Sequence, residues 1–169
     1  MKLRKLVRMK TLYLIMLLSW MLSVCSLVYA QSGKLPPFRV VQSNGKVFKA
    51  EDLPIGKPII LIYFSPECDH CDKLMKDLMK RQANFKKASI AMITYLPVEK
   101  VSKFVQQYNL NKHPNIYVGT EGNAFFVRNY YKITDMPFIA LHNKNGDVVK
   151  VYRKEGALTD LISQLDKLK

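Results

Sequence analysis

The sequence has 169 residues, about half of them hydrophobic, which suits one compact domain. Its 27 Lys and Arg residues outnumber its 13 Asp and Glu residues, giving a net charge of +14. Such a balance favours nucleic acid or an anionic membrane, but the lysines are spread over predicted helices and turns. Without an Arg-rich run or an aromatic stacking motif, we expect solvated surface lysine and no nucleic-acid partner.

The first 30 residues have the pattern of an export signal. Five basic residues and no acid lie at positions 2–10, and Leu12–Leu22 is then apolar apart from Ser19. The segment ends in Val28–Ala30, which suits a signal-peptidase site. We expect cleavage after Ala30, which leaves 22 basic residues against 13 acidic ones and a net charge of +9.

Two alternatives to cleavage after Ala30 are retention as a membrane anchor and lipidation. Thr11–Tyr29 approaches the roughly 20 apolar residues that span a bilayer, which would make it a membrane anchor. Leu22–Cys25 loosely resembles a bacterial lipoprotein box, with lipidation at Cys25, but Val24 stands where a small residue is expected. In all three cases the expected location is outside the cytoplasm, either periplasmic or membrane-anchored and facing the periplasm.

A short linker and a β hairpin are expected next. Residues 31–37 are polar and contain proline, which indicates a linker to a folded domain at 38–169. Phe38–Val41 and Lys46–Phe48 are β-prone and flank Ser43–Gly45, in which Asn-Gly favours a tight turn. The domain is therefore expected to open with a hairpin.

A continuous apolar run at Ile59–Phe64 predicts a strand that is covered on both faces. The following segment has apolar residues three and four positions apart, which is helical spacing; they are Cys71, Leu74, Met75, Leu78 and Met79. The CxxC motif of Cys68 and Cys71 is therefore expected at a strand-to-helix junction.

The middle of the chain alternates between strand and helix patterns. Ser89–Leu96 predicts a buried strand, and Val98–Tyr108 predicts a helix with one apolar face. Asn115–Val118 is ambiguous, and Asn123–Tyr131 fits a short helix. This alternation predicts parallel strands joined by right-handed crossovers.

The C-terminal part predicts a second hairpin and a helix. Phe138–His142 and Asp147–Tyr152 flank the turn residues Asn143–Gly146. Residues 158–168 have the apolar spacing of an amphipathic helix that covers one face of a sheet. The whole order predicts an α/β fold with a central mixed β-sheet flanked by helices.

Thiol chemistry is the expected function of the CxxC motif. With Cys25 in the signal, Cys68 and Cys71 are the two cysteines of the mature chain, and a bridge across two residues closes too short a loop to stabilise the fold much. A thiolate is favoured at a helix N-terminus, where Cys68 is expected. Cys71 follows one turn later and can attack a mixed disulfide at Cys68. Cys68 is therefore the expected nucleophile and Cys71 the resolving thiol.

Three neighbours are expected to tune this pair. A partly protonated His70 would stabilise a thiolate at Cys68 and make the pair more oxidising. Glu67 and Asp69 would act in the opposite sense by repulsion. The sequence does not show which of these opposing effects on the Cys68 thiolate is larger. The redox potential therefore stays open across the range from thioredoxin-like to strongly oxidising enzymes.

These residues resemble the thioredoxin superfamily, and within it the exported bacterial branch of TlpA- and ResA-like, or redoxin-domain, oxidoreductases. The resemblance covers about residues 38–168, and its carriers are Ile59–Phe64, Ser65–Cys71 and Asp135–Ile139. It implies a thioredoxin-like fold in which Pro137 is cis and packs beside the CxxC. It also implies that the backbone of Met136 pairs with substrate, and that Val98–Tyr108 belongs to the helical insertion of this branch.

The resemblance implies protein thiols and disulfides as substrates and no organic cofactor or metal. It favours a reductase fed by a membrane electron donor. His70 and the lack of an acid at Ile62, where thioredoxin has a buried one, leave an oxidase open. Glu67 replaces the tryptophan of thioredoxins, and together with Ile62 this departure leaves unassigned the group that handles the proton at Cys71. The oligomeric state has no signal in the sequence.

Two other readings compete. A thiol peroxidase would use the Ser65 hydroxyl, three residues before Cys68, with positive charge from Arg128, but disulfide exchange suits a second cysteine three residues away better. A non-catalytic metal-binding module would combine the CxxC with His70, His113 or His142, although one CxxC is weak evidence for a closed zinc site.

Overall fold

The computed structural model describes residues 16, 33–153 and 157–168. Apart from Met16, the predicted export signal at 1–30 lies outside the described residues, and so does the lipidation alternative at Cys25. Among the described residues, no helix has the length and apolar character needed to cross a membrane. A compact unit begins at Lys34.

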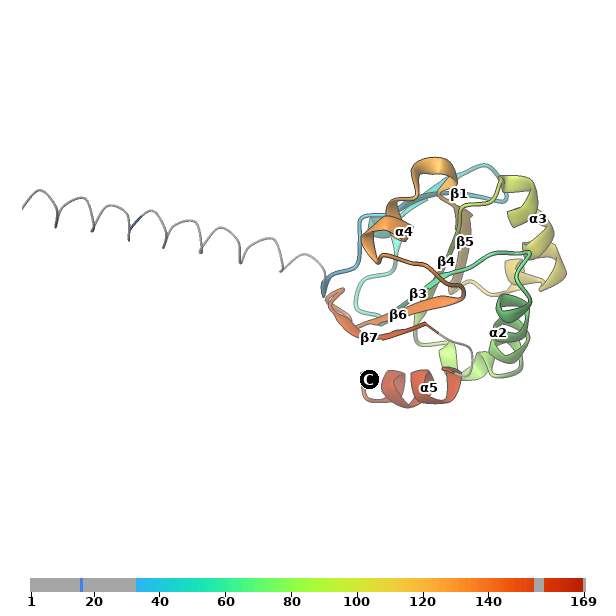
Figure 1. Ribbon diagram of the computed structural model, residues 1–169. Coiled ribbons are helices and arrows are strands. Elements are labelled where there is room, and N and C mark those ends of the chain that lie inside the picture. Colours follow the sequence, from blue (N-terminus) through green and yellow to red (C-terminus); the bar gives the residue numbers. More distant parts are fainter. Residues whose placement is uncertain (1–15, 17–32, 154–156, 169) are drawn as a thin grey trace, which may run out of the picture. The chain divides into compact units, whose positions relative to one another are not determined.

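Seven strands form one mixed sheet in the order β2-β1-β5-β4-β3-β6-β7 (Figure 1). The central strand β3 pairs in parallel with β4, and β4 pairs in parallel with β5, whereas β6 runs antiparallel to β3. The predicted mixed sheet is confirmed. The strands are β1 (Arg39–Gln42), β2 (Val47–Lys49), β3 (Ile59–Tyr63), β4 (Ser89–Thr94), β5 (Ile116–Thr120), β6 (Phe138–His142) and β7 (Val148–Tyr152).

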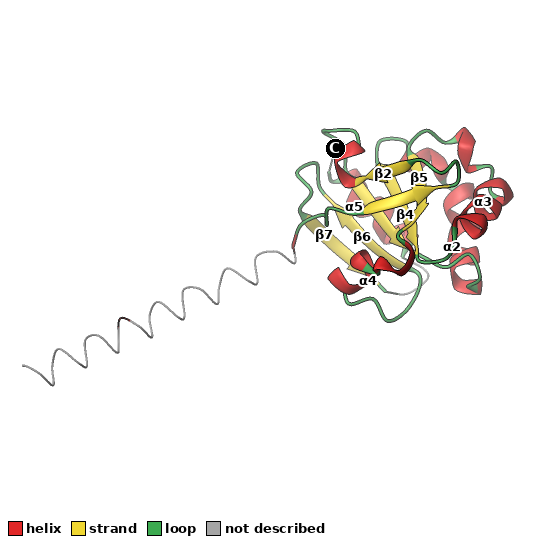
Figure 2. Cartoon of the chain, turned by 90° about the horizontal axis from the view of Figure 1, so that it is seen from above, coloured by secondary structure: helices red, strands yellow, loops and turns green. Residues whose placement is uncertain are grey.

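Helices lie on both sides of this sheet (Figure 2). Apolar residues of α2 (Asp69–Lys80), α3 (Val98–Gln107) and α5 (Leu158–Asp166) share one buried cluster, and α4 (Phe126–Tyr130) contributes Val127 to the other. The strand β3 contributes to both clusters, because its side chains alternate between the two faces of the sheet: Ile60 and Ile62 lie in the first cluster, and Leu61 and Tyr63 in the second. Every residue of β3 is buried, as its continuous apolar run predicts.

The described elements differ from the expected ones in several places, and the helix expected at Asn123–Tyr131 is split at Phe125 into a 3-10 turn and α4. The ambiguous segment Asn115–Val118 lies mostly in the strand β5, because β5 pairs with β4 on one side and β1 on the other. The strand β4 ends at Thr94, two residues early, before the Pro97 that precedes α3. Residues 34–37, expected in the linker, contact the domain. Leu35 N donates to Gly146 O at 2.8 Å, and the backbone of Lys34 forms an isolated antiparallel β-bridge with Asp147.

Gly119 allows the close approach of β5 to the N-terminal hairpin. A Cβ atom on Gly119 would lie 2.6 Å from Val40 Cγ2 and 3.0 Å from Val41 O. Both distances are too short for a carbon contact, so any side chain here would push β1 and β5 apart. Because β1 joins the rest of the sheet through β5, the glycine keeps the hairpin in place.

We expect Gly119→Ala to lower the free energy of unfolding by about 1–3 kcal/mol, because overpacking displaces well-packed neighbours. Urea denaturation measures the change. The Val40→Ala variant is the matched partner: the double variant should be less destabilised than the sum of the two single ones. Additive effects would show that the limiting contact is Val40 Cβ at 2.8 Å or Val41 O at 3.0 Å, which the Val40→Ala variant keeps, and not Val40 Cγ2.

Candidate active site

The Cys68 thiol lies at the start of α2, directly after the loop that follows β3. The Cys68 backbone is extended (φ −107°, ψ 121°) and serves as the N-cap of the helix. Its N–H donates to Ser65 O at 3.2 Å, and its carbonyl accepts from Asp72 N at 3.0 Å. The expected junction is thus observed, and the half-buried Cys68 sits where the unpaired N–H groups of a twelve-residue helix begin.

Cys71 lies one turn further into the helix and is only 2% exposed. It packs in the cluster that contains Phe64 and Met75. Burial raises the pKa of the Cys71 thiol to about 12, with a smaller rise from the hydrogen bond and charge of Cys68 and an opposing backbone hydrogen bond from Ser65. The two sulfurs are therefore within hydrogen-bonding reach of each other, but only Cys68 is open to solvent.

The segment before β6 completes the surroundings of Cys68. The Met136–Pro137 peptide bond is cis, as the resemblance implies. Cys68 Sγ donates to Met136 O at 3.7 Å, and Pro137 itself is buried. The structure thereby brings Met136 and Pro137 to the CxxC from 68 residues further along the chain.

The charged neighbours of the motif are exposed, and one of them has a partner that the sequence did not indicate. Glu67 Oε1 lies 2.6 Å from Lys100 Nζ on α3. Asp69 and His70 are exposed in the first turn of α2. The negative charge of Glu67, expected to repel a thiolate at Cys68, is thus partly balanced by Lys100. No local pattern could reveal this contact across 33 positions.

A second polar link joins α3 to the active-site helix. The Tyr108 hydroxyl donates to the carboxylate of Asp72, which also pairs with Lys76 Nζ at 2.7 Å. The hydrogen bonds from Lys76 and Tyr108 lower the pKa of Asp72. Because Glu67 precedes Cys68 and Asp72 follows Cys71, α3 is attached on both sides of the motif.

A buried acid is present, but it follows β5 and does not stand on β3, where the resemblance to thioredoxin would place it. Glu121 follows β5, is 9% exposed, and accepts hydrogen bonds from Tyr63 Oη at 2.8 Å and Val127 N at 2.7 Å. Burial, followed by the hydrogen bond to Glu121, raises the pKa of Tyr63. Glu121 is not among the groups that shift the pKa of Cys71. It holds the end of β3 and the start of α4 together.

The residues proposed for a peroxidase are engaged elsewhere. Ser65 Oγ accepts a hydrogen bond from Glu67 N at 3.2 Å. Arg128 lies on α4, with its guanidinium 5.8 Å from the ring centres of Tyr95 and Phe125. The helix α4 packs in the apolar cluster on the sheet face opposite to that of Cys71.

The histidines considered for a metal site are dispersed. His142 is fully buried at the end of β6, where it pairs with Ile59 at the start of β3, whereas Cys68 follows the other end of β3. His113 lies in the loop before β5, also at that far end. In the part of the chain that the structure describes, no three His, Cys, Asp or Glu side chains form a group that could hold a metal ion.

Comparisons with known proteins agree with this architecture. Residues 32–156 match the AhpC/TSA family. A secreted disulfide oxidoreductase of Mycobacterium tuberculosis, homologous to E. coli DsbE, has a TM-score of 0.64 and 19% identity over 78% of this chain and 96% of its own. DsbF of that organism has a TM-score of 0.65 and 21% identity, over 79% of this chain and 96% of its own. A thioredoxin-like protein of Porphyromonas gingivalis has a TM-score of 0.63 and 20% identity, over 79% of this chain and 90% of its own. A comparison with curated sequences gave no match. The structural likenesses confirm the thioredoxin-like fold.

The buried His142 makes stability depend on pH. Burial lowers the pKa of His142 to about 4, and Tyr131 Oη hydrogen-bonds to its Nε2 at 2.8 Å. An unfolded histidine titrates near 6.5, so between these values the unfolded chain binds the extra proton and stability falls as the pH falls. We expect a loss of about 3 kcal/mol from pH 7 to pH 4 at this site.

Urea denaturation across that range, for the wild type and for His142→Phe, isolates this contribution from the other acids. The slope of unfolding free energy against pH should be smaller in the variant. Identical slopes would show that the pKa of His142 is the same in the folded and the unfolded chain, which would contradict its burial as a neutral ring.

Proposed function

Because this chain belongs to the AhpC/TSA family and places an accessible Cys68 over a buried Cys71, we propose that it is an exported thiol–disulfide oxidoreductase that acts on protein substrates. The observation that carries the proposal is the unequal exposure of two sulfurs in mutual reach at the start of α2. Cys68 is the nucleophile and Cys71 the resolving thiol.

The exchange takes two displacements. The Cys68 thiolate attacks one sulfur of a substrate disulfide, forms a mixed disulfide, and releases the other substrate sulfur as a thiolate that takes up a proton. Cys71 then loses its proton, attacks the sulfur of Cys68 and closes the Cys68–Cys71 disulfide, and the second substrate sulfur leaves as a thiolate that takes up a proton. Two electrons pass from the cysteine pair to the substrate, and the reverse sequence oxidises a substrate dithiol.

The environment of Cys71 suits the second step and not the first. A thiol whose pKa is about 12 stays protonated at neutral pH and does not compete with Cys68 for substrate. Two of the influences that raise this pKa, the hydrogen bond and the charge of Cys68, come from the Cys68 thiol itself. They are removed when Cys68 is held in a mixed disulfide, which favours deprotonation of Cys71 at that stage.

Met136 and Pro137 form the substrate-binding edge in this proposal. The Met136 carbonyl lies 3.7 Å from Cys68 Sγ, so a substrate segment that pairs with this backbone would present its disulfide to Cys68. Backbone pairing selects an extended segment with little regard to its side chains, which suits protein substrates. The redox potential of the cysteine pair is tuned by its exposed neighbours Glu67, Asp69 and His70. Lys100 offsets the charge of Glu67.

The proposed setting is the periplasm, with the chain soluble or held by its N-terminal segment. The basic start and apolar run of residues 1–30 support export. The neighbour from Mycobacterium tuberculosis is described as a secreted disulfide oxidoreductase. We propose the reducing direction, with a membrane electron donor that returns electrons to the Cys68–Cys71 disulfide.

Trapping tests the assignment of the two cysteines. With insulin as the probe disulfide, Cys71→Ala should accumulate a covalent adduct through Cys68 that reductant releases, because its second step is missing. Its turnover should fall by roughly two orders of magnitude or more relative to the wild type. Non-reducing electrophoresis with mass spectrometry detects the adduct.

The matched control is Cys68→Ala, which should form no adduct because the remaining sulfur is buried. Adducts through Cys71 in that control would reverse the two roles. Rapid peroxide consumption by Cys71→Ala without any insulin adduct would instead support the thiol peroxidase.

A further inference from the structure

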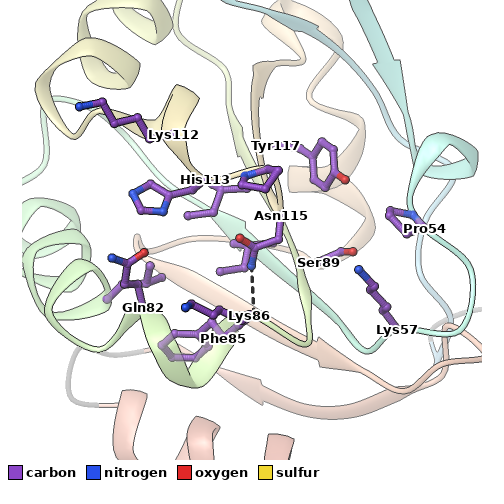
Figure 3. A pocket seen from close by; sticks show the side chains of 14 residues that line it. Pro54, Lys57, Gln82, Phe85, Lys86, Ser89, Lys112, His113, Asn115 and Tyr117 are labelled. Carbon is purple, nitrogen blue, oxygen red and sulfur yellow. Dashed lines mark hydrogen bonds between the residues drawn. The ribbon is translucent and has the colours of Figure 1, made fainter.

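A cavity of about 650 Å³ lies at the edge of the sheet opposite to Cys68 (Figure 3). It is lined by Ser89 at the start of β4 and Ile116 at the start of β5. Cys68 follows the other end of β3, which runs parallel to β4, so the length of five strand residues, about 16 Å, separates the two places. The thiol chemistry does not use this cavity.

Three lysines from separate segments surround it. Lys57 precedes β3, Lys86 precedes β4, and Lys112 precedes β5, and all three side chains are exposed. Among the described residues that line the cavity there is no Asp or Glu, and none of these lysines forms an ion pair within the described part of the chain. The cavity therefore carries positive charge that the domain itself does not balance.

A buried hydroxyl without a partner lies among these lysines. Ser89 is 1% exposed, and its Oγ is the buried side-chain polar atom of the described residues that makes no hydrogen bond. Figure 3 draws it between Asn115 and Lys57. By contrast, Asn115 Nδ2 donates to Phe85 O and Ala88 O, both at 3.0 Å. A buried hydroxyl that stays unpaired costs stability, so its presence here points to a ligand that accepts its proton.

We propose that this cavity binds a phosphate group. Lysine ammonium groups attract phosphate as point charges, and hydrogen bonds with an ionised partner are the stronger kind. The Ser89 hydroxyl donates to one phosphate oxygen, and Lys57, Lys86 and Lys112 supply positive charge around the cavity that attracts the phosphate. Three unpaired lysines suit a doubly charged phosphate better than a single carboxylate.

The phosphate could belong to a free small molecule or to the headgroup of a membrane lipid. Two features connect this end of the domain with a membrane. The chain enters the domain at a neighbouring hollow, which Lys34 and Leu35 line together with Lys57. Ile55, in the same hollow, is completely exposed. Glu51 lines this hollow too but pairs with Lys49, and Lys34 pairs with Asp147. An exposed apolar residue beside Lys57 and Lys144, for which the described part of the chain shows no ion pair, is typical of a surface that meets anionic lipid.

Lysine acetylation of the full chain, read by mass spectrometry, tests the site and distinguishes the two sources. The probes are inorganic phosphate at constant ionic strength, vesicles of phosphatidylcholine, and vesicles that also contain phosphatidylglycerol. The internal controls are Lys46, Lys103 and Lys167, which are exposed and do not line the cavity. We expect Lys57, Lys86 and Lys112 to react at least about threefold more slowly when the site is occupied, and the controls to be unaffected.

Protection by inorganic phosphate identifies a site for a small phosphorylated ligand, and protection by the anionic vesicles alone identifies a headgroup site. Both support the proposal. Equal reactivity of the two lysine sets with every probe would overturn it.

Two serine variants test the buried hydroxyl. Ser89→Ala should weaken the protection and leave the free energy of unfolding unchanged or higher, because it removes an unpaired polar group. Ser102→Ala, whose hydroxyl already donates to Ser43 O at 3.3 Å, should keep the protection. Equal protection in both variants would contradict the role of Ser89. Cys68→Ala should be protected like the wild type, which separates this site from the thiol chemistry.

Discussion

The change from an extended to a helical backbone at Cys68 is the feature on which the active site depends. Because Cys68 is the N-cap of α2, its side chain leaves the helix axis and stays accessible, while Cys71 one turn later is turned into the core. The motif thereby contains two identical thiols in different surroundings. This difference gives the exchange its order, since one sulfur meets substrate and the other resolves the adduct.

The rest of the fold keeps this junction in one position. The strand β3 is buried on both faces and delivers the chain to Cys68, and the segment before β6 places Met136 against the sulfur. The helix α3 contacts both sides of the motif through Lys100 and its C-cap Tyr108. The ring centroids of its Phe104 and of Phe64 lie 4.6 Å apart. Its attachment gives α3 a direct influence on the charge and position of the active-site loop.

Local patterns in the sequence predicted most of the elements, because burial on one or both faces leaves a period that can be read directly. The CxxC junction and both hairpins are of this kind. The long-range contacts were not predicted: Lys100 at Glu67, the buried Glu121 at Tyr63, and His142 in the core. A buried His and an exposed one have the same local signature, and an ion pair across 33 positions leaves no periodic trace. The ambiguous β5 became a strand only through its two neighbours.

The most direct test of the central claim is the equilibrium of the reduced full chain with mixtures of reduced and oxidised glutathione. We expect a reversible disulfide between Cys68 and Cys71, with a single midpoint that falls in the reducing part of the thioredoxin-to-oxidase range. Mass spectrometry should show the loss of two hydrogens and no lasting glutathione adduct. A chain that only accumulates glutathione on Cys68, or that never closes the pair, would show that the two cysteines do not act as a redox pair.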